Sequence, residues 1–482
     1  MPPANRKLGE KERQVLVKGG VSEKKMPYDD RAKKSMHFST IEGALSSAAS
    51  SINNSFVTPF ALALKATSSE IALIASLRTL GETLAQIPGA LLTQYFSRKT
   101  IWTFSTLISR ILWIPILLLP FVNVNSPVHL LISLLFAVSF FTAMRAPAWS
   151  SLMGDIVPQD MRGHYFGRRN MIAGLAGLTA TLVSGALLSE YGFSLIFAVS
   201  VVLGLASVYF FAKMHEPQTP VVYHYRHSYT LSLKDLAAAL RINRNFVLFT
   251  LFLAAMSLAV SIAGPFFAVY MLRDLKISYL WFAALVSFEA LITLIFQPYW
   301  GQLSDRYGER KILAVTGIMI CFVPFIWLFV SSPGHILIAN FFSSFAWAGF
   351  DLVSFNFLLA VTPSEKRPQY VANHTFLRGL ATVAGSLGGY FIVAHLEGRA
   401  LLFMSGLQII FFASFLLRLA SLVFMTMISD LKTKEHEIIP VRYVFWRAVA
   451  VEPAHGLKHA VEYTFRYPYE LAKMRKKLWK KG

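Results

Sequence analysis

Eight ionisable side chains lie in stretches of the chain that are otherwise apolar, where the chemistry open to them is ion pairing or proton binding. They are Arg78, Glu82, Arg110, Arg145, Glu289, Asp351, Arg378 and Arg418. A charge at the middle of a membrane helix costs about 2.5–3.5 kcal/mol on insertion scales. Each of these side chains therefore needs a partner, an aqueous cavity or a proton. Arg78 and Glu82 are four residues apart, so they can pair on one face of a helix.

The composition is that of a membrane protein. The 482 residues are 55% hydrophobic and 15% charged, and the mean hydropathy is +0.51. The single cysteine, Cys321, excludes an intramolecular disulfide. The formal charge of +20 is explained by basic loops facing anionic lipid headgroups, so we expect a lipid bilayer and no nucleic acid as partner.

The chain contains apolar stretches of about twenty residues, the length needed to cross a bilayer core of about 30 Å. The predicted spans are 39–64, 69–93, 100–123, 127–153, 166–189, 193–213, 247–271, 278–302, 311–331, 335–360, 370–395 and 400–428. They predict a bundle of twelve transmembrane helices, with six-helix halves at 39–213 and 247–428. Hydrophilic segments remain at 1–38, 214–246 and 429–482.

Basic residues gather in the N-terminal segment and in alternate loops, so both termini are predicted to be cytoplasmic in a multi-pass protein of the cell membrane. The linker at 214–246 contains a capping-box pattern that starts at Ser232, which predicts a short helix. The basic, aromatic tail at 429–482 is interpreted as lying on the inner leaflet, with a solubilising tail as the alternative.

The two halves of the chain repeat each other in sequence. Pro59 corresponds to Pro265, and "GALLTQYFSRK" at 89–99 matches "GQLSDRYGERK" at 301–311 at both ends. "DIVPQDMRGHYFGRRNMIAG" at 155–174 likewise resembles "AVTPSEKRPQYVANHTFLRG" at 360–379. The three separations are 206, 212 and 205 residues. This near-constant spacing predicts two parallel six-helix repeats around a central cavity, an arrangement of secondary transporters.

The stretch "GQLSDRYGERK" resembles the cytoplasmic loop between helices 8 and 9 of the major facilitator superfamily, and "PAWSSLMGDIVPQDMRGHYFG" is similar to that family's end of helix 4 and the loop after it. The resemblance covers about residues 39–428. It implies that Asp305 latches the halves together on the cytoplasmic side, by contacting the start of helix 5. The predicted switch consists of Gly301, Asp305, Arg306, Gly308, Arg310, Lys311, Arg168 and Arg169. A solvated basic loop is the alternative.

The same resemblance places helices 4 and 10 on the central cavity and helices 3 and 12 at the periphery, so Arg110 and Arg418 are interpreted as structural or snorkelling. Arg145 and Asp351 occupy nearly equivalent places in the repeat and are expected to approach across the cavity, either for function or as a static ion pair. Asp351 and Glu289 are candidate proton carriers, because a desolvated carboxyl group can titrate near neutral pH. Glu82 is a further candidate, with pairing to Arg78 as the alternative.

Polar side chains in the apolar spans are candidate substrate contacts. Asn53 and Asn54 belong to a first span rich in serine and asparagine before Pro59. The remaining candidates are Ser257 and Ser261 in helix 7, Arg145 in helix 4, and Trp347 and Asn356 in helix 10. For the serines the alternative is close packing of helices.

These patterns predict a secondary active transporter that moves a small organic solute by alternating access and is coupled to protons. Export of amphipathic compounds is slightly favoured. Import of a sugar or an organic acid, and a non-transporting receptor on the same fold, remain alternatives, since the fifth helix lacks the Gly-Pro pair typical of drug antiporters. The chain has no phosphate-binding glycine loop, no nucleophile elbow and no metal-ligand spacing among its twelve histidines. We expect a monomer with no enzyme activity, no cofactor and no metal.

Overall fold

A computed structural model describes residues 30–93, 95–158, 161–217, 243–362, 367–396 and 406–429. Every regular element in these ranges is a helix, which confirms an all-α protein for the described part of the chain. The predicted linker helix and the aromatic tail beyond residue 429 lie outside the described residues. So do residues 1–29 of the basic N-terminal segment.

The first half of the chain forms the elements α2 to α8. These are α2 (Asp30–Ala63), α3 (Ser68–Leu92), α4 (Arg98–Ile111), α5 (Trp113–Leu118), the 3-10 turn η1 (Leu119–Phe121), α6 (Pro127–Met144), α7 (Ala146–Ile156) and α8 (Arg162–Ala212). Inside α8, Gly192 has φ 76° and ψ 177°, which breaks the helix in a conformation that favours glycine. This break falls between the predicted spans 166–189 and 193–213.

The second half forms the elements α10 to α15. These are α10 (Arg244–Val269), a π-helical turn η3 (Tyr270–Asp274), α11 (Tyr279–Tyr307), α12 (Glu309–Trp327), α13 (Pro333–Val361), α14 (Arg367–Leu396) and α15 (Gly406–Thr426). Short polar residues start several of them. Asn243, Ser278 and Ser332 each accept a hydrogen bond from a backbone N–H in the first turn of the helix that follows.

Prolines account for two breaks within predicted spans. Pro115 follows the break between α4 and α5, and Pro147 follows the break between α6 and α7. Proline has no N–H, so it cannot continue the hydrogen-bond ladder of the helix before it. The backbone N–H of Trp149 donates to the carbonyl of Arg145 at 3.0 Å, which restarts the ladder. Arg145 thus lies at a junction between helices.

Within the described ranges, nine helical segments are long and apolar enough to cross a membrane. They begin at residues 98, 127, 165, 244, 279, 309, 333, 370 and 406. The segment Tyr165–Ala212 contains the break at Gly192 and so holds two of the predicted spans. The helices α2 and α3, which carry Glu42, Arg78 and Glu82, are outside this group. These lengths and compositions support a multi-pass membrane protein.

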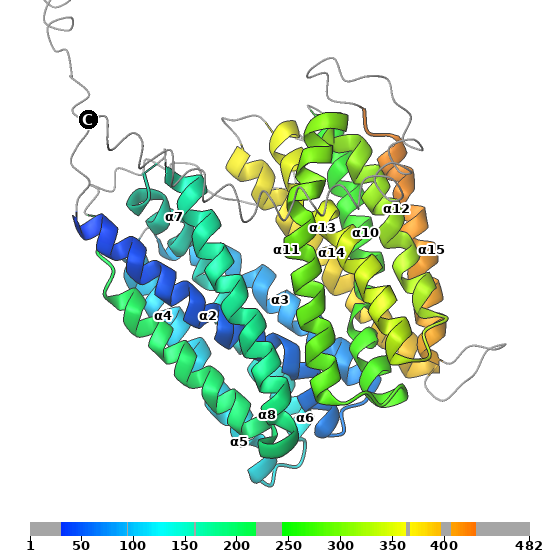
Figure 1. Ribbon diagram of the computed structural model, residues 1–482, viewed down its shortest axis with the longest axis horizontal. Coiled ribbons are helices and arrows are strands. Elements are labelled where there is room, and N and C mark those ends of the chain that lie inside the picture. Colours follow the sequence, from blue (N-terminus) through cyan, green and yellow to red (C-terminus); the bar gives the residue numbers. More distant parts are fainter. Residues whose placement is uncertain are drawn as a thin grey trace, which may run out of the picture.

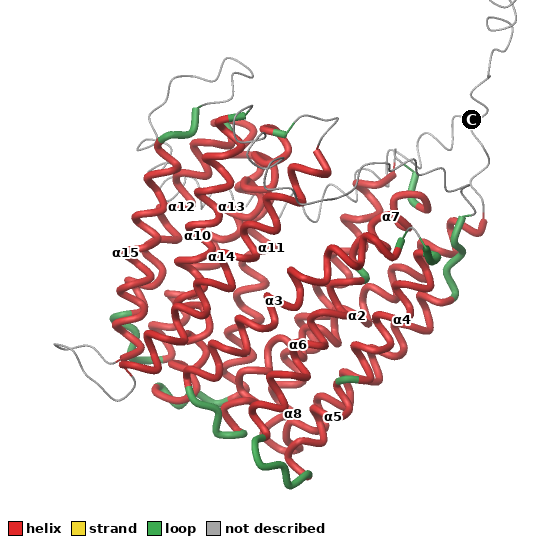
Figure 2. Tube along the Cα trace, turned by 180° about the vertical axis from the view of Figure 1, so that it is seen from behind, coloured by secondary structure: helices red, strands yellow, loops and turns green. Residues whose placement is uncertain are grey.

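The helices form two bundles that spread apart toward one end of the molecule (Figure 1). The α2–α8 bundle leans away from the α10–α15 bundle, and Figure 2 shows the same separation from behind. We call the open end, where α2 and α10 begin and α8 ends, the linker end. At the opposite end, α8 packs against α11 and α3 packs against α14.

Contacts at the opposite end join the two bundles. Arg273 of η3 donates a hydrogen bond of 2.7 Å from Nη1 to the hydroxyl of Ser68 at the start of α3. The rings of Phe193 and Tyr279 lie 5.5 Å apart in an edge arrangement. One apolar core runs through both bundles here, from Phe56 and Ile71 to Phe266 and Phe282. The bundles are therefore closed at this end and open at the linker end.

Close packing of α8 on α11 depends on Gly185. A Cβ atom at Gly185 would lie 2.3 Å from the Cβ of Ala283, far inside van der Waals contact. We expect Gly185→Val to disfavour this closed contact, so that the bundles part here and approach at the linker end. Spin labels at Asn170→Cys and Gln302→Cys, in a Cys321→Ser background, would report a shorter mean distance.

Gly264→Val is the matched control for this experiment, because a Cβ at Gly264 meets nothing within 4 Å. An unchanged distance distribution in Gly185→Val, together with an unchanged distribution in the control, would show that the α8–α11 contact does not set the conformation.

Candidate functional site

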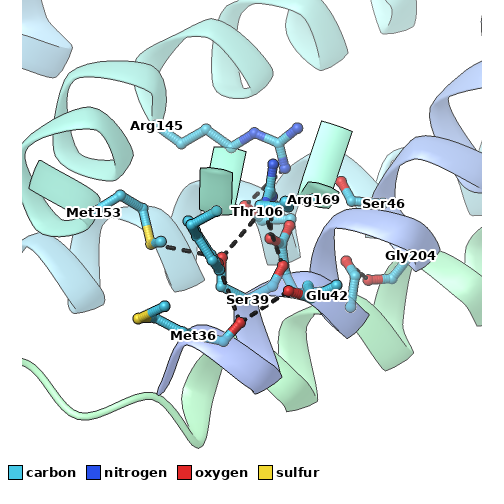
Figure 3. Close-up of polar contacts among 12 residues, drawn as sticks. Met36, Ser39, Glu42, Ser46, Thr106, Arg145, Met153, Arg169 and Gly204 are labelled. Carbon is cyan, nitrogen blue, oxygen red and sulfur yellow. Dashed lines mark hydrogen bonds and ion pairs between the residues drawn. The ribbon is translucent and has the colours of Figure 1, made fainter. Parts of the chain in front are cut away.

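Four charged side chains converge inside the N-terminal bundle, close to the linker end. We call Glu42, Arg110, Arg145 and Arg169 the Glu42 cluster. They come from α2, α4, the α6–α7 junction and α8, respectively. Glu42, Arg145 and Arg169 are drawn in Figure 3, where the guanidinium groups and the carboxylate point toward one region.

The innermost contact of the cluster is an ion pair between α2 and α8. Nη2 of Arg169 lies 2.9 Å from Oε2 of Glu42, and the two side chains are only 11% and 4% exposed. Nε of Arg169 also donates to the carbonyl and the hydroxyl of Ser39, at 3.1 and 3.2 Å. The guanidinium carbon lies 4.8 Å from the ring centroid of Trp149. Arg169 is therefore held by a charge, two oxygens and an aromatic face.

Arg145 faces the same carboxylate from the other side of the cluster. Its Nη1 donates to the hydroxyl of Thr106 at 3.2 Å, and its guanidinium carbon lies 5.4 Å from the ring centroid of Trp102. The charge of Arg145 acts on Glu42. The residue is half-buried.

Arg110 lies behind the wall of the site. It is 5% exposed, and its Nη2 donates to the hydroxyls of Ser46 and Ser50 on α2, at 3.2 and 3.5 Å. Its buried Nε has no hydrogen-bond partner among the described residues. Its charge also acts on Glu42.

Two glycines make room for these arginines. A Cβ at Gly43 would lie 2.7 Å from the guanidinium carbon of Arg169, and a Cβ at Gly204 would lie 2.5 Å from Cδ of Arg110. Any larger residue at either position would displace a guanidinium group. The small residues of α2 and α8 are thus part of how the sequence places the charges.

The Glu42 cluster borders a cavity of about 380 Å³. It is lined by Glu42, Gly43, Ser46, Ser47, Ser50, Trp102, Thr142, Arg145, Ala146, Trp149, Ser150, Arg169 and Ala173. Its walls combine hydroxyl groups, two indole rings and charged groups. This is the mixture of apolar surface and few directed polar groups that small-molecule sites use.

A second polar group lies in the C-terminal bundle. Nε of Arg378 on α14 donates to the hydroxyl of Ser257 on α10 at 3.1 Å. The charges of Arg378 and Asp351 on α13 act on each other. Next to them, Nδ1 of His374 lies 3.1 Å from the hydroxyl of Thr250. The charge of Asp351 is therefore compensated within its own bundle.

The expected approach of Arg145 to Asp351 is not made in this structure. Arg145 contacts Thr106 and Trp102 and acts on Glu42, whereas Asp351 is exposed and acts on Arg378. No ion pair joins Arg145 to Asp351 in the described ranges. In this open arrangement the nearest opposite charge of each residue belongs to its own bundle.

The other predicted proton carriers have different surroundings. The Glu289 side chain on α11 is half-buried and forms no ion pair with any described residue. Glu82 on α3 is exposed and interacts electrostatically with Arg78. Nη2 of Arg78 donates to Oδ1 of Asn54 at 2.7 Å. Glu289 is thus the carboxyl group with the least compensation.

The predicted substrate contacts divide into buried and accessible residues. Asn53 is 4% exposed, and its Oδ1 accepts a hydrogen bond of 2.6 Å from Ser200. It joins α2 to the second part of α8 in this conformation, and its role as a substrate contact stays a prediction. Asn54, the next residue, is exposed and bonded to Arg78. Ser261, Trp347 and Asn356 are half-buried, and the ring of Trp347 packs edge-on against Phe350.

The segment 301–311 forms the end of α11 and the start of α12. Gly301 lies within α11, where a Cβ atom would be 3.5 Å from Cδ2 of Leu352, and Gly308 turns the chain with φ 90°. Asp305 is exposed, and no ion pair in the described part of the chain includes it. Arg306 lies over the ring of Tyr307 at 5.3 Å. Arg310 and Lys311 are half-buried at the start of α12.

The predicted partners of Asp305 also lie at the linker end, at the start of α8. Arg168 is exposed, but Arg169 is already paired with Glu42. The prediction that Arg169 serves as a partner of Asp305 therefore conflicts with its contacts here, because its charge and its Nε are used inside the N-terminal bundle. Arg168 is left as the candidate partner.

In the segment 89–99, which repeats the segment 301–311, Arg98 forms ion pairs with two carboxylates. Arg98 pairs with Asp155 through Nη1 and with Glu216 through Nε, the latter at 3.2 Å. Its backbone N–H also donates to Glu216. These contacts tie the start of α4 to the ends of α7 and α8 at the linker end.

A sequence profile of the major facilitator superfamily matches residues 43–260 and 247–453. The chain belongs to the major facilitator superfamily. The chain is 36% identical to a lactose permease of Klebsiella pneumoniae over 103 residues. These residues are 21% of this chain and 78% of the relative. It is 25% identical over 293 residues to a multi-drug resistance efflux pump PmrA homolog of Lactococcus lactis subsp. lactis, which covers 58% of this chain and 69% of that one.

The superfamily fold is also found among solved structures. The nucleoside transporter NupG aligns with a TM-score of 0.62 at 15% identity, over 84% of this chain and 100% of the other. At that identity the likeness concerns the fold alone. The chain therefore has the fold of a superfamily of membrane transporters.

The sequence patterns do not indicate the centre of the Glu42 cluster. Glu42 is absent from the predicted intramembrane charges, Arg110 is interpreted as structural or snorkelling, and Arg169 is assigned to the cytoplasmic switch. Trp102 and Trp149 are not singled out either. The available signal is an acidic residue, Glu42, within a run of alanines, serines and glycine. No group of three or more potential metal ligands occurs among the described residues.

Proposed function

We propose that the chain is a secondary active transporter that moves a small organic solute by alternating access and is coupled to protons. The observation that carries this proposal is the Glu42 cluster beside a cavity, in a molecule whose bundles are parted at one end and packed at the other. Twelve membrane crossings in two parallel repeats, a monomer and cytoplasmic termini belong to the same proposal. The linker end would then face the cytoplasm.

Proton coupling requires a carboxyl group that gains and loses its proton during the cycle. Glu289, Asp351 and Glu82 are the proposed carriers. Glu289 is favoured among them because no cation of the described residues pairs with it, so its ionised form is costly in a poorly hydrated site. Asp351 and Glu82 each have an arginine nearby.

Export of amphipathic compounds is the proposed direction, and the similarity to an efflux pump of Lactococcus lactis supports it. Two indole rings in the cavity suit an amphipathic solute. Import of a sugar or an organic acid is the second candidate, because a lactose permease is also similar and the cavity has more arginines than carboxylates. A non-transporting receptor is the alternative outside this class.

Flux measurements with reconstituted protein test the proposal. Solutes that raise the unfolding temperature of the purified protein would first be selected, and their movement into proteoliposomes measured under an imposed pH gradient of either sign. Net movement that follows the gradient is expected, with protein-free liposomes as the control. A solute that binds but is moved under neither gradient would favour the receptor alternative.

Asp305 is proposed to latch the bundles when the linker end closes, by contacting the start of α8 near Tyr165 and Phe166 or by pairing with Arg168. In the present open conformation Asp305 has no ionic partner in the described part of the chain. We therefore expect Asp305→Asn to slow transport about tenfold while the unfolding temperature stays unchanged. Glu309→Gln, at the nearby acidic position, is the control. Normal transport by Asp305→Asn would exclude the latch.

A further inference from the structure

The Glu42 cluster contains more positive than negative charge, and most of it is buried. Three guanidinium groups face one carboxylate, which leaves two unit positive charges in excess among the described residues. The other titratable group beside the carboxylate is Tyr165, whose hydroxyl donates to the carbonyl of Met36 at 3.1 Å. A neutral phenol does not offset the excess. Asp155 and Glu216 are engaged by Arg98 at the linker end.

Uncompensated charges inside a membrane bundle are costly, so an excess of this kind indicates a missing anion. Arg110 supplies an independent sign of it. Its side chain is 5% exposed, its Nε has no partner in the described residues, and its Nη2 bonds only serine hydroxyls. Ser46 and Ser50 line the cavity, so the hydroxyl groups that accept from Arg110 can donate their own hydrogens into it.

The cavity provides a place for such an anion and for the body that carries it. Arg145 is half-buried and lines the cavity. Trp102 and Trp149 line the same space, and Trp102 is only 2% exposed. Trp102 is itself held rigidly, since its ring stacks on that of Phe211 with 3.6 Å between centroids. An organic anion with a flat apolar body matches these walls.

We propose that the transported solute carries a carboxylate or phosphate group that binds Arg145 and the hydroxyls of Ser46 and Ser50, which Arg110 supports from behind the wall, with its apolar body against Trp149. This inference rests on the proposed transport function and specifies its substrate class. Glu42 acts as the internal anion of the site. It neutralises part of the arginine charge in the empty state, and the anionic group of the solute competes with it for that charge.

Three probes with one ring system and different charges test this inference by binding alone. Indole-3-acetate, indole-3-acetamide and tryptamine would be titrated into the purified full chain, with binding measured by calorimetry and by thermal shift. Phenyl phosphate and benzyl alcohol form a second pair with a smaller ring. We expect an anionic probe to bind at least about tenfold more tightly than its neutral and cationic counterparts, as expected for a charge-assisted hydrogen bond.

Substitutions then locate the site. Arg145→Gln and Arg110→Gln should each weaken anion binding about tenfold or more, and Arg145→Lys should retain part of it. Glu42→Gln should strengthen anion binding about tenfold because the internal competitor is removed, which a purely structural role would not do. Arg244→Gln, an exposed arginine of the other bundle at the same end, is the matched control.

The outcomes separate this inference from the transport proposal. Preference for tryptamine or for the neutral probes, no binding by either anionic probe, or anion binding that is unchanged in Arg145→Gln and Arg110→Gln would each overturn the anion site and leave transport of a different solute intact. Anion binding with the expected variant pattern, but without flux under any gradient, would support the site and refute transport.

Discussion

An Arg169→Gln variant is expected to lose about 3 kcal/mol of unfolding free energy relative to the unchanged protein. Removing one partner of a buried ion pair costs about 3–5 kcal/mol, because the other charge is left uncompensated. Here the cost lies at the lower end, since Arg145 and Arg110 continue to act on Glu42. The variant also loses two hydrogen bonds to Ser39 and the contact with Trp149.

Thermal unfolding of the purified protein, followed by intrinsic fluorescence, would measure the effect. Arg168→Gln is the matched control. Arg168 is adjacent to Arg169 but exposed, so this substitution should change the unfolding free energy by less than about 0.5 kcal/mol. Adding Glu42→Gln to Arg169→Gln should recover part of the loss, since no unpaired carboxylate then remains. Equal stability of Arg169→Gln and Arg168→Gln would contradict the assigned role of the ion pair.

The helices and their order could be predicted from the sequence, because long apolar runs form membrane spans whatever they pack against. A run of apolar residues needs a bilayer or a core, whatever its neighbours, so the predicted spans agree closely with α10, α11 and α13. Gly192 separates two spans through its own backbone conformation. The break at Arg145 was not predicted, because the span 127–153 runs through it, although Pro147 explains it, since proline has no N–H.

The first helix shows where such prediction stops. We expected it to begin at residue 39, but α2 begins at Asp30, so Glu42 lies three turns inside it. A charged side chain near the start of a membrane span can reach water or headgroups, so it needs no partner. The same side chain three turns inside a helix needs partners. Those partners, Arg110, Arg145 and Arg169, come from other helices, and only the packing of the helices brings them together.

Adjacent residues on the same helix can also have opposite fates. Asn53 is buried against Ser200, and Asn54 is exposed and bonded to Arg78. Consecutive side chains on a helix point about 100° apart, so one can face a neighbouring helix and the next an open space. The polar residues of α2 are distributed around the helix, and sequence alone does not indicate which of them face the cavity.

The largest effect on coupling is expected from Glu289→Gln. The Glu289 carboxyl group is half-buried and has no ion pair in the described part of the chain, so losing its proton creates an uncompensated charge. Opening the site to water, or the arrival of a cation, would remove that cost and release the proton. Such a group can couple a conformational change to proton movement. Glutamine has nearly the same shape but cannot titrate.

We therefore expect Glu289→Gln to reduce solute accumulation driven by a pH gradient at least about tenfold, while solute exchange without a gradient remains within about twofold. Proton release on solute addition to the purified protein should disappear in the same variant.

Asp351→Asn and Glu82→Gln are informative comparisons, because Arg378 and Arg78 stabilise the ionised forms of those carboxyl groups. No proton release by the unchanged protein, or release by both Glu289→Gln and Asp351→Asn that equals that of the unchanged protein, would remove both residues as carriers. Loss of exchange as well as accumulation would instead place Glu289 in solute binding, since exchange requires no net proton movement.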